Sequence, residues 1–327
     1  MKKALIISSI KPSPINNGEP SGLIDIVIKE LKKDFLIDFK LISAKRKINK
    51  LSFFIKQVNY DLDLYDFILI YPFHAAFAIK NKKQNKSFVL GPDATSLVWK
   101  RRSKIHGRLD PKRYLFQLIS FVFCLREKHL YKKGVTHIVV GKNDENYLTK
   151  HGIVNTRYLP HPIIEPEISN QSLHKIECPT FVIAGHYSKD MLCNSSVKKI
   201  NKELSGKDLL IVGKRNKWIT TQFPNLKCSY ISFIENYKDI CRPNKHVHLC
   251  PIAFGGGTKN RVLSALNYGC LVFGTEIANE NIIHPNLKGI QVLTSETKFE
   301  ITNVEGYRAN LNELFRTTLS SIINEKN

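Results

Sequence analysis

The sequence has no cysteines in the close pairs that metal and redox motifs use. Its seven cysteines are scattered singly along 327 residues, and their number is odd. A disulfide framework, which stabilises many small secreted domains, is therefore excluded as the organising feature of the fold. Free thiols persist in a reducing compartment, so we expect a cytoplasmic protein.

Long apolar runs are also missing. The longest, YLFQLISFVFCL at residues 114–125, is well short of the roughly 20 residues that a membrane-spanning helix needs. Two interpretations stay open for it: a core helix, or a helix lying at a membrane surface. The opening MKKALIISSI begins like a signal peptide, but its apolar run stops at Lys11 and Pro12 without a cleavage pattern. We predict a buried first strand there.

Acidic residues are scarce, with 28 Asp and Glu against 50 Lys and Arg, a net charge of +22. Residues 1–165 carry 30 basic and 14 acidic residues, so most of the excess lies in the first half. Such a surface favours an anionic partner: nucleic acid, an anionic membrane or a phosphorylated substrate. A general abundance of lysine in the source proteome is the alternative. Nucleic-acid recognition motifs are absent from the sequence, so we predict no nucleic-acid partner.

Short apolar runs alternate with helical patterns along the chain. In the first half the predicted strands are residues 4–8, 36–42, 67–71, 88–90, 137–140 and 157–159, with helices at 23–33, 51–58, 114–132 and 144–150. The polar segment LPHPIIEPEISNQSLHKIECP then interrupts the pattern. A second series follows, with strands at 181–184, 209–212, 230–233, 247–250, 271–273 and 290–293, and helices at 195–204, 258–268 and 307–323.

This alternation is typical of a parallel sheet covered by helices on both faces. We predict an α/β fold with two doubly wound, Rossmann-like domains, residues 1–165 and 166–327, facing a ligand cleft. The C-terminal helix belongs to the second domain or packs back on the first.

The segment FGGGTKNRVLSALNYGC at residues 254–270 places three glycines directly before a helix. A glycine-rich turn at a helix N-terminus presents backbone N–H groups and the positive end of the helix dipole to a ligand. Lys259 and Arg261 in the first turn would oppose that dipole unless an anion is bound. We therefore predict a phosphate site, with a tight structural turn as the alternative.

The wider string HLCPIAFGGGTKNRVLSALNYGCLVFGTEIANENI resembles the C-terminal nucleotide-sugar site of GT-B glycosyltransferases, in particular the family 4-like group (glycosyl transferases group 1). More loosely, INNGEPSG resembles the glycine loop after the first strand, GPDATSL the Asp-x-x-Ser segment, and VVGKNDENYL the end of the N-terminal domain. FVIAGHYSKDMLCNSSVKKI and LLIVGK resemble the first two strands of the second domain. The resemblance implies a donor-binding second domain and an acceptor-binding first domain.

The resemblance also implies roles for individual residues. The diphosphate would be met by Gly256, Gly257, Thr258, Lys259 and Arg261. Glu280 and Asn281 would approach the donor sugar or its nucleotide, with Glu280 a catalytic candidate. Gly185, His186 and Lys214 would line the base and phosphate side, and Gly18, Ser21 and Gly22 would form the N-terminal glycine loop. The family usually retains anomeric configuration and needs no metal, so no cofactor is expected beyond the nucleotide-sugar substrate.

This sequence departs from the family at one pair of positions. Two glutamates eight residues apart commonly contact the ribose, whereas here those places hold Gly256 and Ser264. The Ser264 hydroxyl can still hydrogen-bond a ribose hydroxyl, although it is shorter and neutral.

Candidates for substrate contact in the first domain are Asp93 in GPDATS and His74 in YPFHAAF, each following a predicted strand. A carboxylate at such a place is alternatively a helix cap. The triplet DLD at residues 61–63 matches the Asp-x-Asp metal motif of a different fold, but so short a match is common by chance. HVHLC at residues 246–250 suggests zinc, but a packed strand face is the better interpretation, and we predict no metal site.

Together these patterns predict a glycosyltransferase that moves a sugar to a glycan or lipid-linked glycan acceptor. The charge and the family habit favour bacterial surface polysaccharide synthesis (capsule, O-antigen or lipopolysaccharide), with a peripheral position at the inner membrane face. Two alternatives stay open: a nucleotide-sugar epimerase or hydrolase of the same fold, and a non-catalytic, degenerate transferase that acts as a scaffold.

Overall fold

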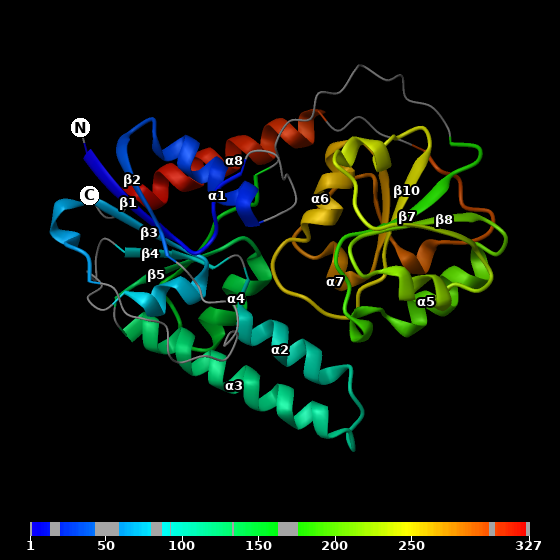
Figure 1. The fold of residues 1–327 in the computed structure, drawn as a ribbon, viewed down its shortest axis with the longest axis horizontal. Coiled ribbons are helices and arrows are strands. Elements are labelled where there is room, and N and C mark those ends of the chain that lie inside the picture. The colour runs from blue at the N-terminus through cyan, green and yellow to red at the C-terminus, as the bar shows by residue number, and fades with distance from the viewer. Residues whose placement is uncertain are drawn as a thin grey trace. The chain divides into compact units, whose positions relative to one another are not determined.

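The structure is a computed structural model, and it describes residues 2–13, 20–42, 59–79, 87–91, 93–132, 134–162, 176–300 and 305–324. The chain divides into two compact units (Figure 1). The first comprises residues 1–103, 114–162 and 311–327, and the second comprises residues 104–113 and 163–310.

The first unit is built on a parallel sheet of six strands in the order β2-β1-β3-β4-β5-β6. Successive side chains of a strand point to opposite faces, and in β1 both sets, Ala4 with Ile6 and Leu5 with Ile7, are buried. Strands buried on both faces form when helices cover both faces of the sheet. The strand bounds are β1 Lys2–Ser8, β2 Phe35–Leu41, β3 Phe67–Tyr71, β4 Ser87–Leu90, β5 Thr136–Val139 and β6 Thr156–Tyr158.

Helices from opposite ends of the chain cover one face of this sheet. In Figure 1, α1 (Pro20–Leu31) lies beside α8 (Glu305–Asn324) over the strands. Ile24 of α1 and Phe315 and Leu319 of α8 share one buried apolar cluster with Ile6 of β1. Residues of α8, the last helix described, therefore complete the core of the first unit.

The long helix α3 (Pro111–Lys132) covers the other face, where Phe116, Ile119 and Phe123 pack into a cluster with Leu5 and Ile7. Two further helices, α2 (Thr95–Lys104) and α4 (Lys142–Lys150), enclose a smaller cluster with β5. No described helix combines the length and apolar character that a membrane crossing requires.

The second unit is built on another six-stranded parallel sheet, in the order β12-β11-β10-β7-β8-β9. Its helices are α5 (Asn194–Glu203), α6 (Asn260–Asn267) and the single turn α7 (Glu276–Asn279). Every residue of the central strand β10 is buried. The strand bounds are β7 Thr180–Ala184, β8 Asp208–Val212, β9 Lys227–Ile231, β10 His246–Cys250, β11 Leu271–Gly274 and β12 Leu287–Gly289.

These two sheets confirm the predicted α/β fold with doubly wound, parallel sheets. Two strands lie about three residues earlier in the chain than the sequence predicted. β9 ends at Ile231, and the apolar Phe233 that extended the predicted strand is 75% exposed. β12 pairs with β11 through residues 287–289, whereas Ile290 begins a 3-10 turn. Helix α2 was not predicted, and the helix predicted at residues 51–58 lies outside the described residues.

Candidate functional site

The strand order of the second sheet creates a point at which ligands commonly bind. The connection from β7 runs to β8 on one side, whereas β10, which is paired with the other edge of β7, continues to β11. Loops that leave two neighbouring parallel strands in opposite directions open a crevice at the carboxyl end of the sheet. Gly185 and His186 follow β7, and the glycine loop follows β10.

The loop of residues 254–259 is buried apart from the half-buried Thr258, and two of its glycines have identifiable roles. A Cβ atom on Gly255 would lie 2.8 Å from Cε of Lys259, so any other residue there would force the Lys259 side chain to move. Gly257 has a φ of +59°, in the left-handed region that glycine adopts readily. The glycines thus allow the chain to fold back over Lys259 before α6 begins.

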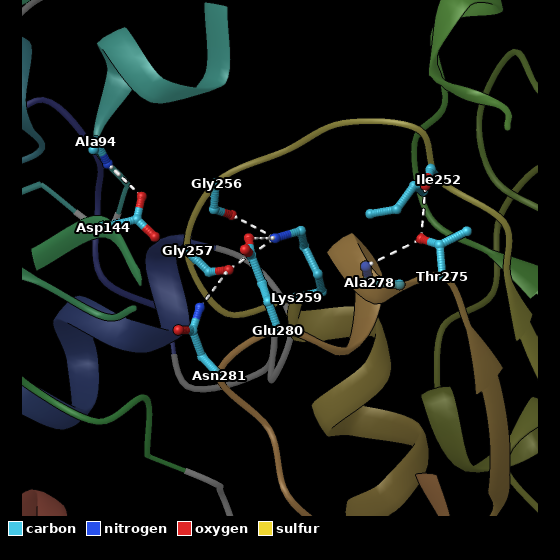
Figure 2. A network of polar contacts seen from close by, with 10 residues as sticks. All are labelled: Ala94, Asp144, Ile252, Gly256, Gly257, Lys259, Thr275, Ala278, Glu280 and Asn281. Atoms are coloured by element: carbon cyan, nitrogen blue, oxygen red, sulfur yellow. Dashed lines mark hydrogen bonds and ion pairs between the residues drawn. The ribbon is translucent and has the colours of Figure 1, made fainter. Parts of the chain in front are cut away.

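Lys259 is the centre of a buried polar network, shown in Figure 2. Its Nζ donates to the carbonyl oxygens of Gly256 and Gly257, at 2.9 and 2.8 Å, and forms an ion pair with Oε1 of Glu280 at 3.0 Å. The two charged side chains are only 8% and 7% exposed. Three acceptors match the three donors of an ammonium group, so Lys259 fixes the shape of the loop.

A short turn brings Glu280 and Asn281 to this loop. Thr275 accepts a hydrogen bond from the Ala278 N–H at 3.2 Å and donates to the Ile252 carbonyl at 2.7 Å, which ties the start of α7 to the segment after β10 (Figure 2). Asn281, with a φ of +66°, donates from Nδ2 to the Gly257 carbonyl at 3.3 Å. Both predicted donor-sugar residues therefore lie against the glycine loop.

Arg261 joins the loops after β7 and β10. Its Nη2 donates to the His186 carbonyl at 3.1 Å, and its guanidinium lies 4.4 Å from the ring centre of the buried Tyr187. Gly185 has a φ of +107°, and a Cβ there would lie 3.2 Å from Cζ of Arg261. Nη1 is buried and has no hydrogen-bond partner among the described residues. The guanidinium is thus held in a fixed position between the loops after β7 and β10.

Asn216 ties the loop after β7 to the end of β8, and it was not identified from the sequence. Its Nδ2 donates to the carbonyl oxygens of Gly185 and Val212, and its Oδ1 accepts from the Tyr187 N–H at 3.4 Å. Gly213, at the end of β8, has a φ of +138° and packs against both Gly185 and Asn216. The sequence shows only an asparagine four residues after the predicted strand 209–212, which is ordinary for a turn. Its complete burial, which marks it as a structural support, is visible only in the structure.

The remaining residues predicted in this unit are placed as follows. Lys214 is exposed and directly follows Gly213 at the carboxyl end of β8. His186 is exposed and contributes its backbone carbonyl. Thr258 is half-buried between the loop and α6, whereas Ser264 lies on α6 with only 6% of its surface exposed.

The first sheet has a switch point of its own, between β1 and β3. Ser9 follows β1, and its Oγ lies 3.0 Å from Nε2 of His74, which belongs to the 3-10 segment Phe73–Ala78 after β3. Desolvation lowers the pKa of His74, so the ring is neutral near pH 7 and can accept a proton. The predicted candidate His74 therefore stands where a ligand of the first unit would bind.

Asp93 lies half-buried between β4 and the start of α2. Two other carboxylates accept hydrogen bonds from the first residues of this helix region. Oδ1 of Asp144 accepts from the Ala94 N–H at 2.8 Å, and Glu127 accepts from the Ser96 N–H at 3.2 Å. Burial raises the pKa of Glu127 to about 7.

The predicted N-terminal glycine loop is only partly described. Gly18 lies outside the described residues. Ser21 and Gly22 belong to the first turn of α1 rather than to a loop, because the helix already begins at Pro20, which tolerates the first helical turn.

Fold and site together define two doubly wound units, each with polar residues gathered at its switch point. Two solved structures are similar over 100% of this chain. One is "lipopolysaccharide outer core galactosyltransferase WaaB apo form", with a TM-score of 0.45, 9% identity and 95% of that chain covered. The other is LpCGTa in complex with UDP, with a TM-score of 0.42, 11% identity and 94% of that chain covered. No protein-family profile matches the chain, and no curated protein matches it.

Proposed function

We propose that this protein is a glycosyltransferase whose second unit binds a nucleotide-sugar donor. The observation that carries the proposal is the state of Arg261, whose Nη1 is buried without a described hydrogen-bond partner at the switch point. A buried cationic donor that lacks an acceptor is costly, and an anionic ligand would remove that cost. The bidentate geometry of guanidinium suits phosphate oxygens.

The surrounding residues favour a diphosphate. The glycine loop and the N-terminus of α6 offer backbone approach and a favourable dipole to an anion. Lys259 and Glu280 compensate each other's charge, so the excess positive charge comes from Arg261 and the exposed Lys214. The motif resemblance to family 4-like GT-B enzymes supports the same ligand.

The proposed transfer makes modest demands on the protein. The bond between the anomeric carbon and the diphosphate oxygen breaks, the acceptor hydroxyl oxygen bonds to that carbon, and the departing phosphate accepts the hydroxyl proton. Positive charge beside the leaving oxygens therefore supplies most of the stabilisation, which we assign to Arg261. We propose a retaining, metal-independent reaction, with Lys259 and Glu280 holding the loop and the donor sugar in place.

The first unit is the proposed acceptor site. His74 and Ser9 lie at its switch point, and Asp93 follows the neighbouring strand β4. As acceptor we propose a lipid-linked glycan at the cytoplasmic face of a membrane, of the kind used to build capsule, O-antigen or lipopolysaccharide. In support, α3 carries exposed apolar side chains at Leu118 and Phe121.

The competing function is a scaffold without activity. It is favoured by Gly256 and Ser264 at the places where the family carries two glutamates. A donor epimerase or hydrolase is a second competitor, since it needs the same nucleotide site but no acceptor.

Calorimetric titration with UDP, GDP, dTDP and CMP tests the nucleotide site. We expect one of them to bind and Arg261→Gln to weaken binding by about 10- to 100-fold, because a charge-assisted contact contributes about 1.5–3 kcal/mol. The control Arg242→Gln alters an exposed arginine outside the site and should bind like the parent. Equal affinity of the folded Arg261→Gln variant would contradict the proposal.

Turnover assays then separate the three functions. Incubation with the matching nucleotide sugar alone would release free sugar or an epimer from a hydrolase or epimerase. A transferase should release the nucleotide only when acceptor is added. Binding without turnover for any tested acceptor would favour the scaffold.

A further inference from the structure

Three side chains that no sequence motif links meet inside the second unit. Cys241 directly follows the 3-10 turn Tyr237–Ile240, His248 is the middle residue of β10, and Cys270 directly precedes β11. They are 2%, 4% and 0% exposed, respectively. Their burial requires that their polar atoms satisfy one another or a shared ligand.

The ligand atoms of the three residues converge. The two sulfurs and one ring nitrogen all lie within 4.8 Å of one another. Sγ of Cys241 is 3.4 Å from Nε2 of His248, and that nitrogen is 2.8 Å from the Ile240 carbonyl oxygen. In a tetrahedral zinc site, bond lengths of about 2.3 Å to sulfur and about 2.0 Å to nitrogen place these atoms about 3.5 Å apart. The existing separation needs little change to accommodate the ion.

The donor set also selects the kind of ion. Thiolate and imidazole ligands suit Zn²⁺, whereas Mg²⁺ and Ca²⁺ require several oxygen ligands. Two thiolates cancel the charge of a divalent ion, so the site would bury no net charge. Binding would release two thiol protons and would place the remaining imidazole proton on Nδ1.

We propose that Cys241, His248 and Cys270 bind Zn²⁺ as a structural site. In the structure Nε2 can donate its hydrogen to the Ile240 carbonyl oxygen at 2.8 Å, and the zinc ion would take the place of that proton. Cys270 lies at the amino end of β11, whereas the glycine loop leaves the carboxyl end of β10. In a parallel sheet the amino ends and the carboxyl ends of the strands lie on opposite sides. The zinc therefore stabilises the second unit and takes no part in sugar transfer.

The sequence prediction rejected zinc for a different set of residues. His246, His248 and Cys250 alternate along β10, and strand periodicity made them the obvious group. The structure instead combines His248 with cysteines from two other segments, which spacing along the chain does not indicate.

The experiment measures metal in the full-length protein. Protein purified from cells grown with added zinc, and then dialysed extensively, should retain about one zinc ion per chain when measured by elemental analysis. Cys270→Ser should lose most of it, while Cys250→Ser, which alters an equally buried cysteine on β10, should keep it. Substitution of the parent protein with Co²⁺ should give the near-ultraviolet thiolate-to-cobalt absorption, and this readout does not depend on a variant that could fail to fold.

Three results would overturn the proposal. The first is a parent protein that retains no zinc and shows no thiolate-to-cobalt band. The second is equal loss of zinc in Cys250→Ser and Cys270→Ser. The third is an intact mass two hydrogens lower with Cys241 and Cys270 joined, which shows that the pair forms a disulfide instead.

Discussion

At the scale of single residues, the buried ion pair between Lys259 and Glu280 determines how the glycine loop works. The sequence assigned Lys259 to the diphosphate, and that assignment stays a prediction. In the structure its ammonium donates to two loop carbonyls and to Glu280. A lysine that is saturated by its own loop would affect nucleotide binding by shaping the backbone.

We therefore predict that Lys259→Met destabilises the second unit by about 3–5 kcal/mol, because it removes the ammonium group that forms an ion pair with the buried Glu280 carboxylate. Adding Glu280→Gln should restore part of this loss, since the second change removes the buried negative charge that Lys259 balances. Urea denaturation followed through Trp218, after Trp99→Phe, reports on the second unit alone, and exposed Lys288→Met is the control. A cost below about 1 kcal/mol with weakened nucleotide binding would instead favour direct contact with the diphosphate.

The limit of sequence reading is clearest at this scale. The glycine loop, Lys259 and Arg261 could be singled out because they follow a predicted strand in a short string, whereas Glu280 was implied by the resemblance to GT-B sequences. The partners of Arg261 could not, because Tyr187 and the His186 carbonyl come from a loop more than 70 residues earlier. Side-chain contacts between distant segments depend on the register of the sheet, which composition and periodicity do not give.

At the scale of elements, α3 is apolar on two sides. Phe116, Ile119 and Phe123 point into the core, which agrees with the interpretation of residues 114–125 as a core helix. The exposed apolar residues Tyr114, Leu118, Phe121 and Leu125 follow helical spacing along another side. Residues 95–132 also contain ten Lys and Arg against two acidic residues. An apolar stripe on this basic segment, residues 95–132, suits an anionic lipid surface.

We predict that the protein sediments with vesicles of anionic phospholipid and not with neutral ones. Leu118→Ser with Phe121→Ser should reduce binding by removing buried apolar contact, and Lys104→Glu with Lys112→Glu should reduce it by roughly 1 kcal/mol or more for each lost attraction. These four side chains are exposed, so the fold should persist. Binding should also weaken as salt is raised. If the parent protein does not sediment with anionic vesicles at low salt, the basic segment of residues 95–132 must serve another partner.

At the scale of the whole molecule, two sheets give the chain two separate cores. The fold class could be predicted because the central strands are apolar runs bounded by turn residues, and several of them, such as residues 4–8, 181–184 and 247–250, are followed by a helical pattern. The strands that were predicted at the wrong residues, β9 and β12, lie at the two edges of the second sheet. Edge strands are less buried, so their sequences carry a weaker apolar pattern. The division into units was harder to foresee at the end of the chain, since Phe315 to Ile323 of α8 join the first core.

We predict that Phe315→Ala destabilises the first unit by about 3–5 kcal/mol and leaves the second unchanged, because it opens a cavity in the first core only. The chain has two tryptophans, Trp99 in the first unit and Trp218 in the second. Single-tryptophan variants followed in urea should show a shift of the Trp99 transition alone. Leu314→Ala, at a position 49% exposed, is the matched control. A shift of both transitions would show that the units unfold together.

The return of α8 to the first core also has a consequence for synthesis on the ribosome. The face of the first sheet that α8 covers cannot be closed until residues beyond 310 have been made, well after β6 is complete. At about 5–20 residues per second, translating the intervening stretch of about 150 residues takes roughly 8–30 s. During that interval the nascent first unit presents an open apolar face, and the second unit can finish folding before the first.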